Sequence, residues 1–216
     1  MVYFVKINVY LLHQITINQT KRIMKKLLVI AFAILSFSAV NAQVAYVGFQ
    51  SVTGKSKANN TTVSKSNSGF FLGGAMNFEI ADALGIQPGL EVSYAGRTEN
   101  DALLGDFKYS MWGIKIPVDV NYGFELAPDF KLSVYAGPSI YVGLSSSRKN
   151  GNTTYDLYGD DLSRFGLGLG MGAWCDFKDM LRLKIGYDLG LLNRAQDKDN
   201  FNYKESAFMI SVGYLF

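Results

Sequence analysis

The feature that most constrains the fold is a strict alternation of apolar residues with small or polar ones. It is clearest over residues 112–125, which read WGIKIPVDVNYGFE. One face would carry Trp112, Ile114, Ile116, Val118, Val120, Tyr122 and Phe124, and the other Gly113, Lys115, Pro117, Asp119, Asn121, Gly123 and Glu125. A period of two residues is the mark of a β-strand whose two faces differ. We therefore expect an all-β chain.

The pattern recurs in eight segments, at about residues 43–52, 69–79, 84–96, 109–125, 131–145, 163–177, 181–192 and 204–216. Strands of soluble sheets usually have ~5–6 residues, whereas ~9–11 alternating residues cross a bilayer as a tilted strand. Short turns alternate with long polar loops, and we expect the first loop, 53–68, to be flexible and solvated. The sequence thus predicts an eight-stranded antiparallel up-and-down transmembrane β-barrel, with its long loops outside the cell.

The last ten residues, AFMISVGYLF, continue the alternation to the final position. Their apolar face is formed by Phe208, Ile210, Val212, Tyr214 and Phe216. In a water-soluble sheet this strand would be an exposed, aggregation-prone edge. Pairing with the first strand would close the ring, and lipid would cover the apolar face. We also expect these five residues to act as the C-terminal signal that barrel-assembly machinery reads.

Residues 24–42, MKKLLVIAFAILSFSAVNA, place basic, apolar and small residues in the order of a secretory signal peptide. Cleavage is predicted before Gln43. A membrane-spanning helix is the alternative, but it needs ~20 apolar residues, about twice the length of this run. We expect residues 1–23 to be an upstream start artefact and residues 43–216 to form the barrel domain.

Charge and composition exclude several classes of function. The chain has 21 basic and 18 acidic residues, but five of the bases and none of the acids precede residue 43, which leaves 16 and 18. A nucleic-acid partner therefore has no compositional support. The one histidine, His13, also precedes this point, so no histidine triad or histidine metal site is expected in the barrel. Cys175, the one cysteine, is expected to pack rather than react.

Several motifs resemble a known family. The segments LAPDFKLSVYAGPSIYVG, FGLGLGMGAW and the closing SVGYLF, with the signal ending NAQ, are similar to the outer membrane protein beta-barrel domain family, which is PorT-like and often labelled porin family. The resemblance covers nearly all of residues 43–216 and implies a small outer-membrane barrel. A secretion role like that of PorT is one implication, but no functional residue is carried over.

The run GLGLGMG, residues 166–172, invites comparison with a phosphate-binding loop. Its glycines fall at every second residue inside a strand, whereas a phosphate cradle needs a strand-to-helix turn. We expect no cofactor. Instead, the glycines would face the lumen and leave room for Tyr135, Tyr141 or Trp174.

Charged residues on the predicted inner faces are the strongest candidates for a site. They are Glu79, Glu91, Lys115, Asp119, Glu125, Arg164, Asp176, Arg182, Lys184 and Asp188. Eight strands enclose only enough width for side chains, and buried charges are tolerated when they are paired. We therefore predict a paired network of Glu91, Lys115, Asp119, Arg182, Lys184 and Asp188 that plugs the barrel. Removing Lys115 alone should then destabilise the barrel more than removing Lys115 and Asp119 together.

These observations favour a non-enzymatic integral protein of the cell outer membrane, with no catalytic residues, metal or cofactor. It would be a monomer whose long loops contact a surface protein or glycan, and its other partners would be outer-membrane lipid and the assembly machinery. A narrow passive pore, an enzyme with a carboxylate-only site and a PorT-like secretion accessory remain alternatives. A soluble lipocalin-like barrel is disfavoured, because the wide apolar face would then have to point inward.

Overall fold

The computed structural model describes residues 43–58, 61–101, 105–151, 153–158, 161–197 and 201–216. The predicted start artefact and signal peptide lie outside these residues. The strands are β1 (Val44–Ala58), β2 (Thr61–Ala75), β3 (Phe78–Ala81), β4 (Leu84–Asp101), β5 (Gly105–Ala127), β6 (Phe130–Asn150), β7 (Thr153–Asp156), β8 (Phe165–Phe177), β9 (Leu181–Gly190) and β10 (Phe201–Leu215). Within the described ranges, no helix has the length and hydrophobicity to cross a membrane.

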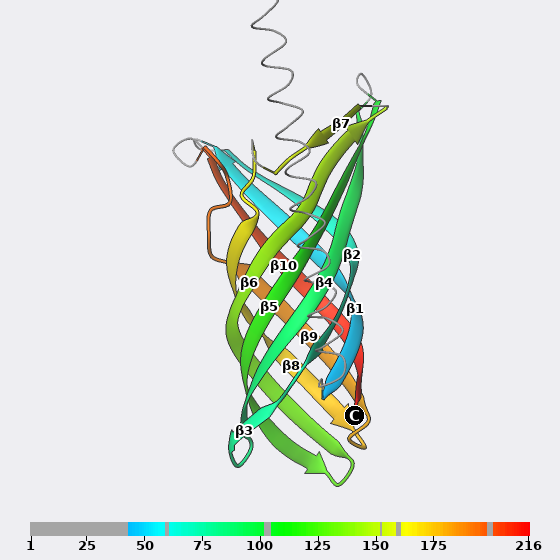
Figure 1. The fold of residues 1–216 in the computed structure, drawn as a ribbon, viewed down its shortest axis with the longest axis vertical. Coiled ribbons are helices and arrows are strands. Elements are labelled where there is room, and N and C mark those ends of the chain that lie inside the picture. Colours follow the sequence, from blue (N-terminus) through cyan, green and yellow to red (C-terminus); the bar gives the residue numbers. More distant parts are fainter. Residues whose placement is uncertain (1–42, 59–60, 102–104, 152, 159–160, 198–200) are drawn as a thin grey trace, which may run out of the picture. The chain divides into compact units, whose positions relative to one another are not determined.

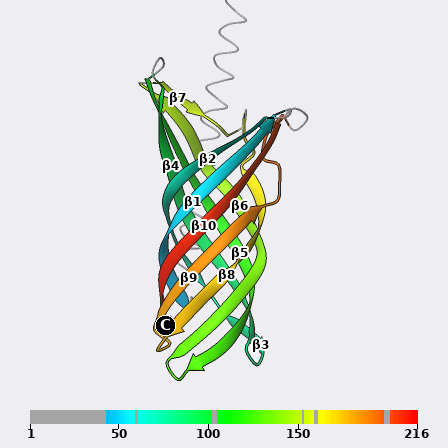
Figure 2. The same ribbon diagram turned by 180° about the vertical axis from the view of Figure 1, so that it is seen from behind.

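Eight long strands form one closed antiparallel ring in the order β1, β2, β4, β5, β6, β8, β9 and β10. Closure comes from β10, which pairs with β1 from Val44↔Leu215 to Ala58↔Phe201. Figures 1 and 2 show these strands winding round the barrel at a common tilt. The short strands β3 and β7 pair with β4 and β6. The predicted eight-stranded up-and-down barrel is therefore confirmed.

The strands extend further than predicted on the long-loop side. The expected flexible loop 53–68 is instead a hairpin, because β1 and β2 pair continuously up to Ala58↔Thr61. The hairpin satisfies its own backbone hydrogen bonds. Apart from Val63, its larger side chains are polar on both faces, so above the apolar band the alternation that revealed the lower strand disappears. The prediction of a flexible loop is wrong for these paired residues.

The outer face of the ring is apolar and the inner face polar. On β5, Trp112, Val120 and Tyr122 are 42–45% exposed, whereas Asp119 is only 3% exposed. The rings of Phe70, Tyr94 and Trp112 contact one another at one end of this face, where Phe70 pairs with Tyr94 and Tyr94 with Trp112. Ten residues separate Trp112 from Tyr122, enough for a tilted strand to span an apolar band ~25 Å tall.

Candidate functional site

The inward face of β9 positions charged side chains at successive levels of the lumen. Nearest the short-turn end, the Arg182 guanidinium donates two hydrogen bonds to the Asp176 carboxylate, at 2.6 and 2.7 Å. A third, to Gln87 Oε1, is 3.3 Å long. Arg182 also lies over the ring of Trp174, 4.3 Å from its centroid. The two charges are thus buried together with most of their hydrogen-bonding capacity used.

The next level joins β9 to β5 across the lumen. Lys184 Nζ lies 3.2 Å from Asp119 Oδ2 and 4.1 Å from the centroid of the Tyr135 ring. Tyr135 in turn stacks on Trp174, with 5.2 Å between ring centroids. Gly172 on β8 and Gly186 on β9 both leave room for Tyr135, because a Cβ added at Gly172 would lie 2.8 Å from its ring and one added at Gly186 would overlap its hydroxyl group.

A third level is built around Lys115 of β5. Its ammonium lies 2.8 Å from Glu91 Oε2 and 3.7 Å from Asp188 Oδ2. Tyr46 donates a hydrogen bond of 3.1 Å to Glu91, and Ser139 donates one of 2.9 Å to Asp188. One buried cation thus serves two carboxylates, and each carboxylate accepts one further hydrogen bond from a hydroxyl group.

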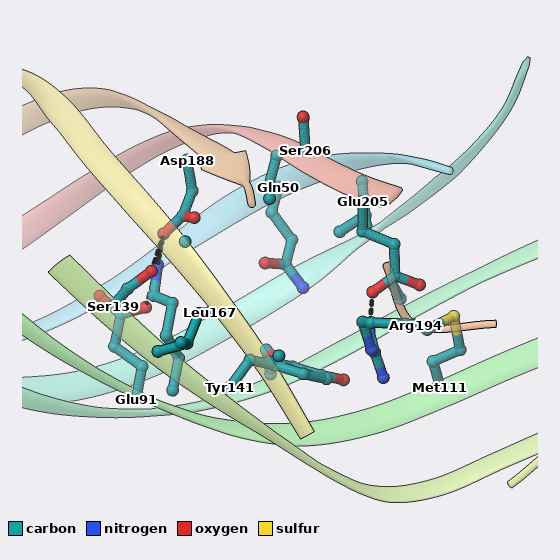
Figure 3. A pocket seen from close by; sticks show the side chains of 18 of the residues that line it. Gln50, Glu91, Met111, Ser139, Tyr141, Leu167, Asp188, Arg194, Glu205 and Ser206 are labelled. Carbon is teal, nitrogen blue, oxygen red and sulfur yellow. Dashed lines mark hydrogen bonds and ion pairs between the residues drawn. The ribbon is translucent and has the colours of Figure 1, made fainter. Parts of the chain in front are cut away.

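A small cavity lies beyond this level, and Figure 3 shows its two charged ends. Its volume is about 80 Å³, several times the ~10–15 Å³ that one water molecule requires. Asp188 and Ser139 lie at one end, and Arg194 contacts Glu205 at the other. Gln50 lies between them. The cavity can hold water or a very small solute within the lumen.

The Arg194 end of the cavity is closed by segments outside the ring strands. Arg194 is only 3% exposed. Besides its ion pair with Glu205, it donates hydrogen bonds of 2.9 and 3.1 Å to the Ser163 carbonyl oxygen. It also donates to the Tyr158 hydroxyl at 3.3 Å. The residues before β8 and after β9 are therefore fixed to the barrel mouth by one guanidinium.

A smaller ionic cluster lies on the rim, above the apolar band. Glu99 is five residues beyond Tyr94 on β4, and Lys65 Nζ lies 2.9 Å from its carboxylate. Arg97 donates a second hydrogen bond to the same oxygen at 3.1 Å. The hydrogen bond from Lys65, together with the two positive charges, holds the pKa of Glu99 below its usual range. Elsewhere in the part of the chain that is described, no group of three or more His, Cys, Asp and Glu residues could hold a metal ion.

Comparison with known proteins identifies the family. A family model described as an outer membrane protein beta-barrel domain matches residues 32–196. The chain belongs to this family. The match covers most of the sequence, and it confirms the resemblance drawn from the sequence motifs. The protein is an integral β-barrel of the outer membrane, so its apolar outer face lies in lipid.

Several solved structures are similar to this outer-membrane barrel. Neisserial surface protein A is 15% identical, with a TM-score of 0.48, over 80% of this chain and 97% of that one. Ail, the attachment invasion locus protein of Yersinia pestis, is 13% identical, with a TM-score of 0.42, over 80% and 98%. The outer membrane enzyme PagL is 10% identical, with a TM-score of 0.45, over 78% and 99%. No curated protein sequence matches the chain significantly.

All six residues of the predicted lumen network lie on the inner face of the outer-membrane barrel, and each forms an ion pair. Asp119 pairs with Lys184 and not with Lys115, so the compensation expected between Lys115 and Asp119 is not seen. Arg182 pairs with Asp176, which lies outside the predicted set. Among the other inward candidates, Glu79 and Glu125 are exposed near the short turns.

Arg164 lies near the barrel mouth, where its guanidinium donates a 2.7 Å hydrogen bond to the Leu144 carbonyl oxygen. The five residues of the predicted assembly signal lie on the outer face. Phe208, Ile210, Val212 and Tyr214 are 44–52% exposed, and Phe216 is 74% exposed.

The Arg194–Glu205 pair was missed by sequence reasoning. Arg194 follows β9 in a polar stretch without periodicity, which predicts only a surface loop. Glu205 carried a usable signal, because it shares the inward parity of Met209 on β10 and had no assigned partner. A second charged layer could have been suspected from that unmatched inward carboxylate.

Proposed function

We propose that this outer-membrane barrel is non-enzymatic, that its lumen is plugged, and that its extended outer hairpins contact a protein or glycan at the cell surface. The observation that carries the proposal is that side chains of β5 form ion pairs with side chains of β9 across the lumen. Lys184–Asp119 and Lys115–Asp188 span the interior at two successive levels. A solute pathway would have to break both contacts.

The chemistry of the lumen agrees with a structural plug. Glu91, Asp119 and Arg182 are only 3–7% exposed, and all three are ion-paired. Removing one partner of such a pair costs ~3–5 kcal/mol, because the other charge is left buried and uncompensated. A proton transfer that neutralised one of these residues would have a similar effect, so they are poorly suited to exchange protons with a substrate. The one histidine, His13, precedes the barrel. A role in acid–base catalysis would fall to carboxylates that are already engaged.

The outer parts of the strands provide the contact surface. β5 and β6 have 23 and 21 residues, whereas ~9–11 suffice to cross the bilayer. Above the apolar band, Arg148 lies 5.8 Å from the Phe107 ring centroid and 5.3 Å from that of Tyr155. Tyr155 on β7 is 49% exposed. Arginine and aromatic side chains of this kind dominate the binding energy of many protein interfaces.

Conductance measurements test the plugged lumen. The purified barrel, inserted into a planar bilayer, should show no steady ion current. As a positive control for the assay, Lys184→Ala and Asp119→Ala combined with Lys115→Ala and Asp188→Ala remove both bridging levels and should raise the current. A steady current through the wild-type barrel would reject the plug and support the passive-pore alternative.

Site-specific photo-crosslinking in intact cells tests the contact surface. A photoreactive residue in place of Tyr155 should capture a surface macromolecule, and the same residue in place of Glu125, at the short-turn side, should not capture it. Arg148→Gln should weaken the capture, because it removes the cation that holds the two aromatic rings. Capture of a secretion component would favour the PorT-like accessory alternative, and no capture at Tyr155 would reject this surface.

A further inference from the structure

Two lysines face each other directly on the outside of the barrel where the ring closes. Lys55 of β1 and Lys204 of β10 are paired in register. Lys204 has the parity of the lipid-facing Phe208, so both side chains project from the outer face, and both are exposed. Figure 2 shows β1 and β10 side by side. Lys57 lies two residues further along β1 on the same face.

This arrangement is electrostatically unfavourable within the protein. Side chains directly opposite on neighbouring strands have Cβ atoms ~4.5–5.5 Å apart, and like charges in these positions destabilise a sheet. Among the described residues, no carboxylate lies within ion-pair distance of Lys55, Lys57 or Lys204. On the other side of β1, Lys55 is paired with Ser64 and Lys57 with Thr62. The positive charge is therefore available to an anion from outside the chain.

The height of these lysines fits a lipid headgroup. Moving outward along the two strands, Phe208 is followed on the same face by Ser206 and then by Lys204, four residues away. At ~3.3 Å per residue and a tilt near ~40°, this distance corresponds to about 10 Å above the last lipid-facing ring. Thr53 and Ser66 add hydroxyl groups to the intermediate level, 2.9 Å apart. The outer face thus passes from aromatic to hydroxyl to ammonium groups over the depth of a headgroup layer.

A second lysine pair on the other side of the ring provides a comparison. Lys108 of β5 and Lys149 of β6 are also paired in register, and both are exposed. Three strand steps separate them from β1 and β10 in either direction. Here, however, Asp106 lies two residues from Lys108 on the same face of β5. Among the described residues no ion pair joins Asp106 to either lysine, but its carboxylate lowers the net positive charge of this pair, whereas the lysines at the ring closure have no acidic residue on their own face.

We propose that Lys55, Lys57 and Lys204 form a binding site, here called the lysine site, for the phosphate groups of anionic lipid headgroups in the outer leaflet, as distinct from zwitterionic headgroups such as phosphatidylcholine, whose phosphate is neutralised by its own choline. The ammonium groups would bind the phosphates, and the neighbouring serine and threonine hydroxyls would hydrogen-bond the headgroup. This inference goes beyond the proposed surface contact, because it concerns the lipid-facing side of the ring and stands if the plug or the Tyr155 surface is rejected.

Thermal stability in defined bilayers tests the lysine site. The barrel is placed in nanodiscs of phosphatidylcholine with or without bisphosphorylated lipid A, and its Tm is followed by the gel shift of the folded form. Lipid A should raise the Tm of the wild-type barrel, because a ligand that binds only the folded state stabilises it. K55Q/K204Q should lose most of this rise. In phosphatidylcholine alone, this variant should melt at or above the wild-type Tm, since the mutual repulsion has been removed.

The controls separate this proposal from general screening. K108Q/K149Q should keep the full rise, whereas dephosphorylated lipid A and free inorganic phosphate should produce none. The single variants K55Q and K204Q provide the same comparison if the double variant folds poorly. The proposal is overturned if lipid A leaves the wild-type Tm unchanged, if K108Q/K149Q loses the rise equally, or if free phosphate reproduces it.

Discussion

Lys184 of β9 meets Asp119 of β5 across the lumen, with 3.2 Å between Nζ and Oδ2, although β6 and β8 lie between their strands in the ring. An eight-stranded ring is narrow enough for long side chains of facing strands to touch. The same two strands are joined again where Lys115 approaches Asp188. The barrel therefore carries internal cross-links that are independent of its ring of backbone hydrogen bonds.

The first prediction concerns this cross-link. Lys184→Met should destabilise the barrel by ~3–5 kcal/mol, because it leaves Asp119 buried without a counter-charge. The double variant Lys184→Met, Asp119→Asn should be more stable than Lys184→Met alone. Urea unfolding of the barrel in lipid vesicles measures both. A double variant as unstable as the sum of its two single variants would show that the pair is not coupled.

The structure also shows why Lys115 and Asp119 are the wrong pair for such a cycle. The sequence places both on the inner face of β5 but does not indicate which charge on a facing strand each one reaches. That choice depends on the stagger of β5 against β9, which is set by the tilt of the whole ring. Removing Lys115 leaves Glu91 and Asp188 without a counter-charge. The further loss of Asp119 would leave Lys184 without a counter-charge as well.

Much of the fold could be predicted because the bilayer imposes a strict rule on lipid-facing positions. The alternation around Val120 and Asp119 specified the two faces of β5. Its recurrence in eight segments specified the number of membrane-crossing strands. Beyond the apolar band this rule no longer applies, so the continuation of β1 and β2 to Ala58↔Thr61 was missed. The burial of the Arg194 side chain was also missed, because Arg194 lies outside the apolar band. Its hydrogen-bond partner Ser163 is distant in sequence, so no local pattern reveals the contact.

A second prediction tests the lipid-facing register of β10. Replacing Phe208, Ile210 and Val212 together with Asp should prevent insertion, because these side chains are 44–52% exposed on the outer face. One Arg or Lys at the bilayer midplane costs ~2–4 kcal/mol, and Asp somewhat less, so three acids exceed the reserve of a marginally stable fold. Outer-membrane fractionation measures the amount inserted. Ser206→Asp, above the apolar band, is the control and should insert normally.

A third prediction concerns the pH dependence of the rim. The pKa of Glu99 is lowered by the hydrogen bond from Lys65 and by Arg97. Its contribution to stability is therefore complete above the unfolded-state pKa of ~4.3 and is lost as pH falls through the lower folded-state value. Protection of β4 rim amides from hydrogen exchange should decrease below about pH 4. In Glu99→Gln this protection should be weaker at neutral pH and nearly independent of pH, and unchanged behaviour would contradict the assignment.

The last prediction concerns the close approach of Tyr141 to the backbone of β5. A Cβ atom added to Gly113 would overlap the Tyr141 ring and hydroxyl, and the three atoms nearest to it all belong to that side chain. Gly113→Ala should therefore destabilise the barrel, by the ~1–3 kcal/mol typical of overpacking. Because the obstacle is one side chain, Tyr141→Ala should rescue it, and the double variant should be more stable than the two single losses added together. Unfolding in urea measures each variant.

Gly172→Ala is the matched control and should not be rescued by Tyr141→Ala, because its added Cβ would meet the backbone of β9 and the ring of Tyr135 instead. Additive losses for Gly113→Ala and Tyr141→Ala would mean that Tyr141 does not pack over Gly113.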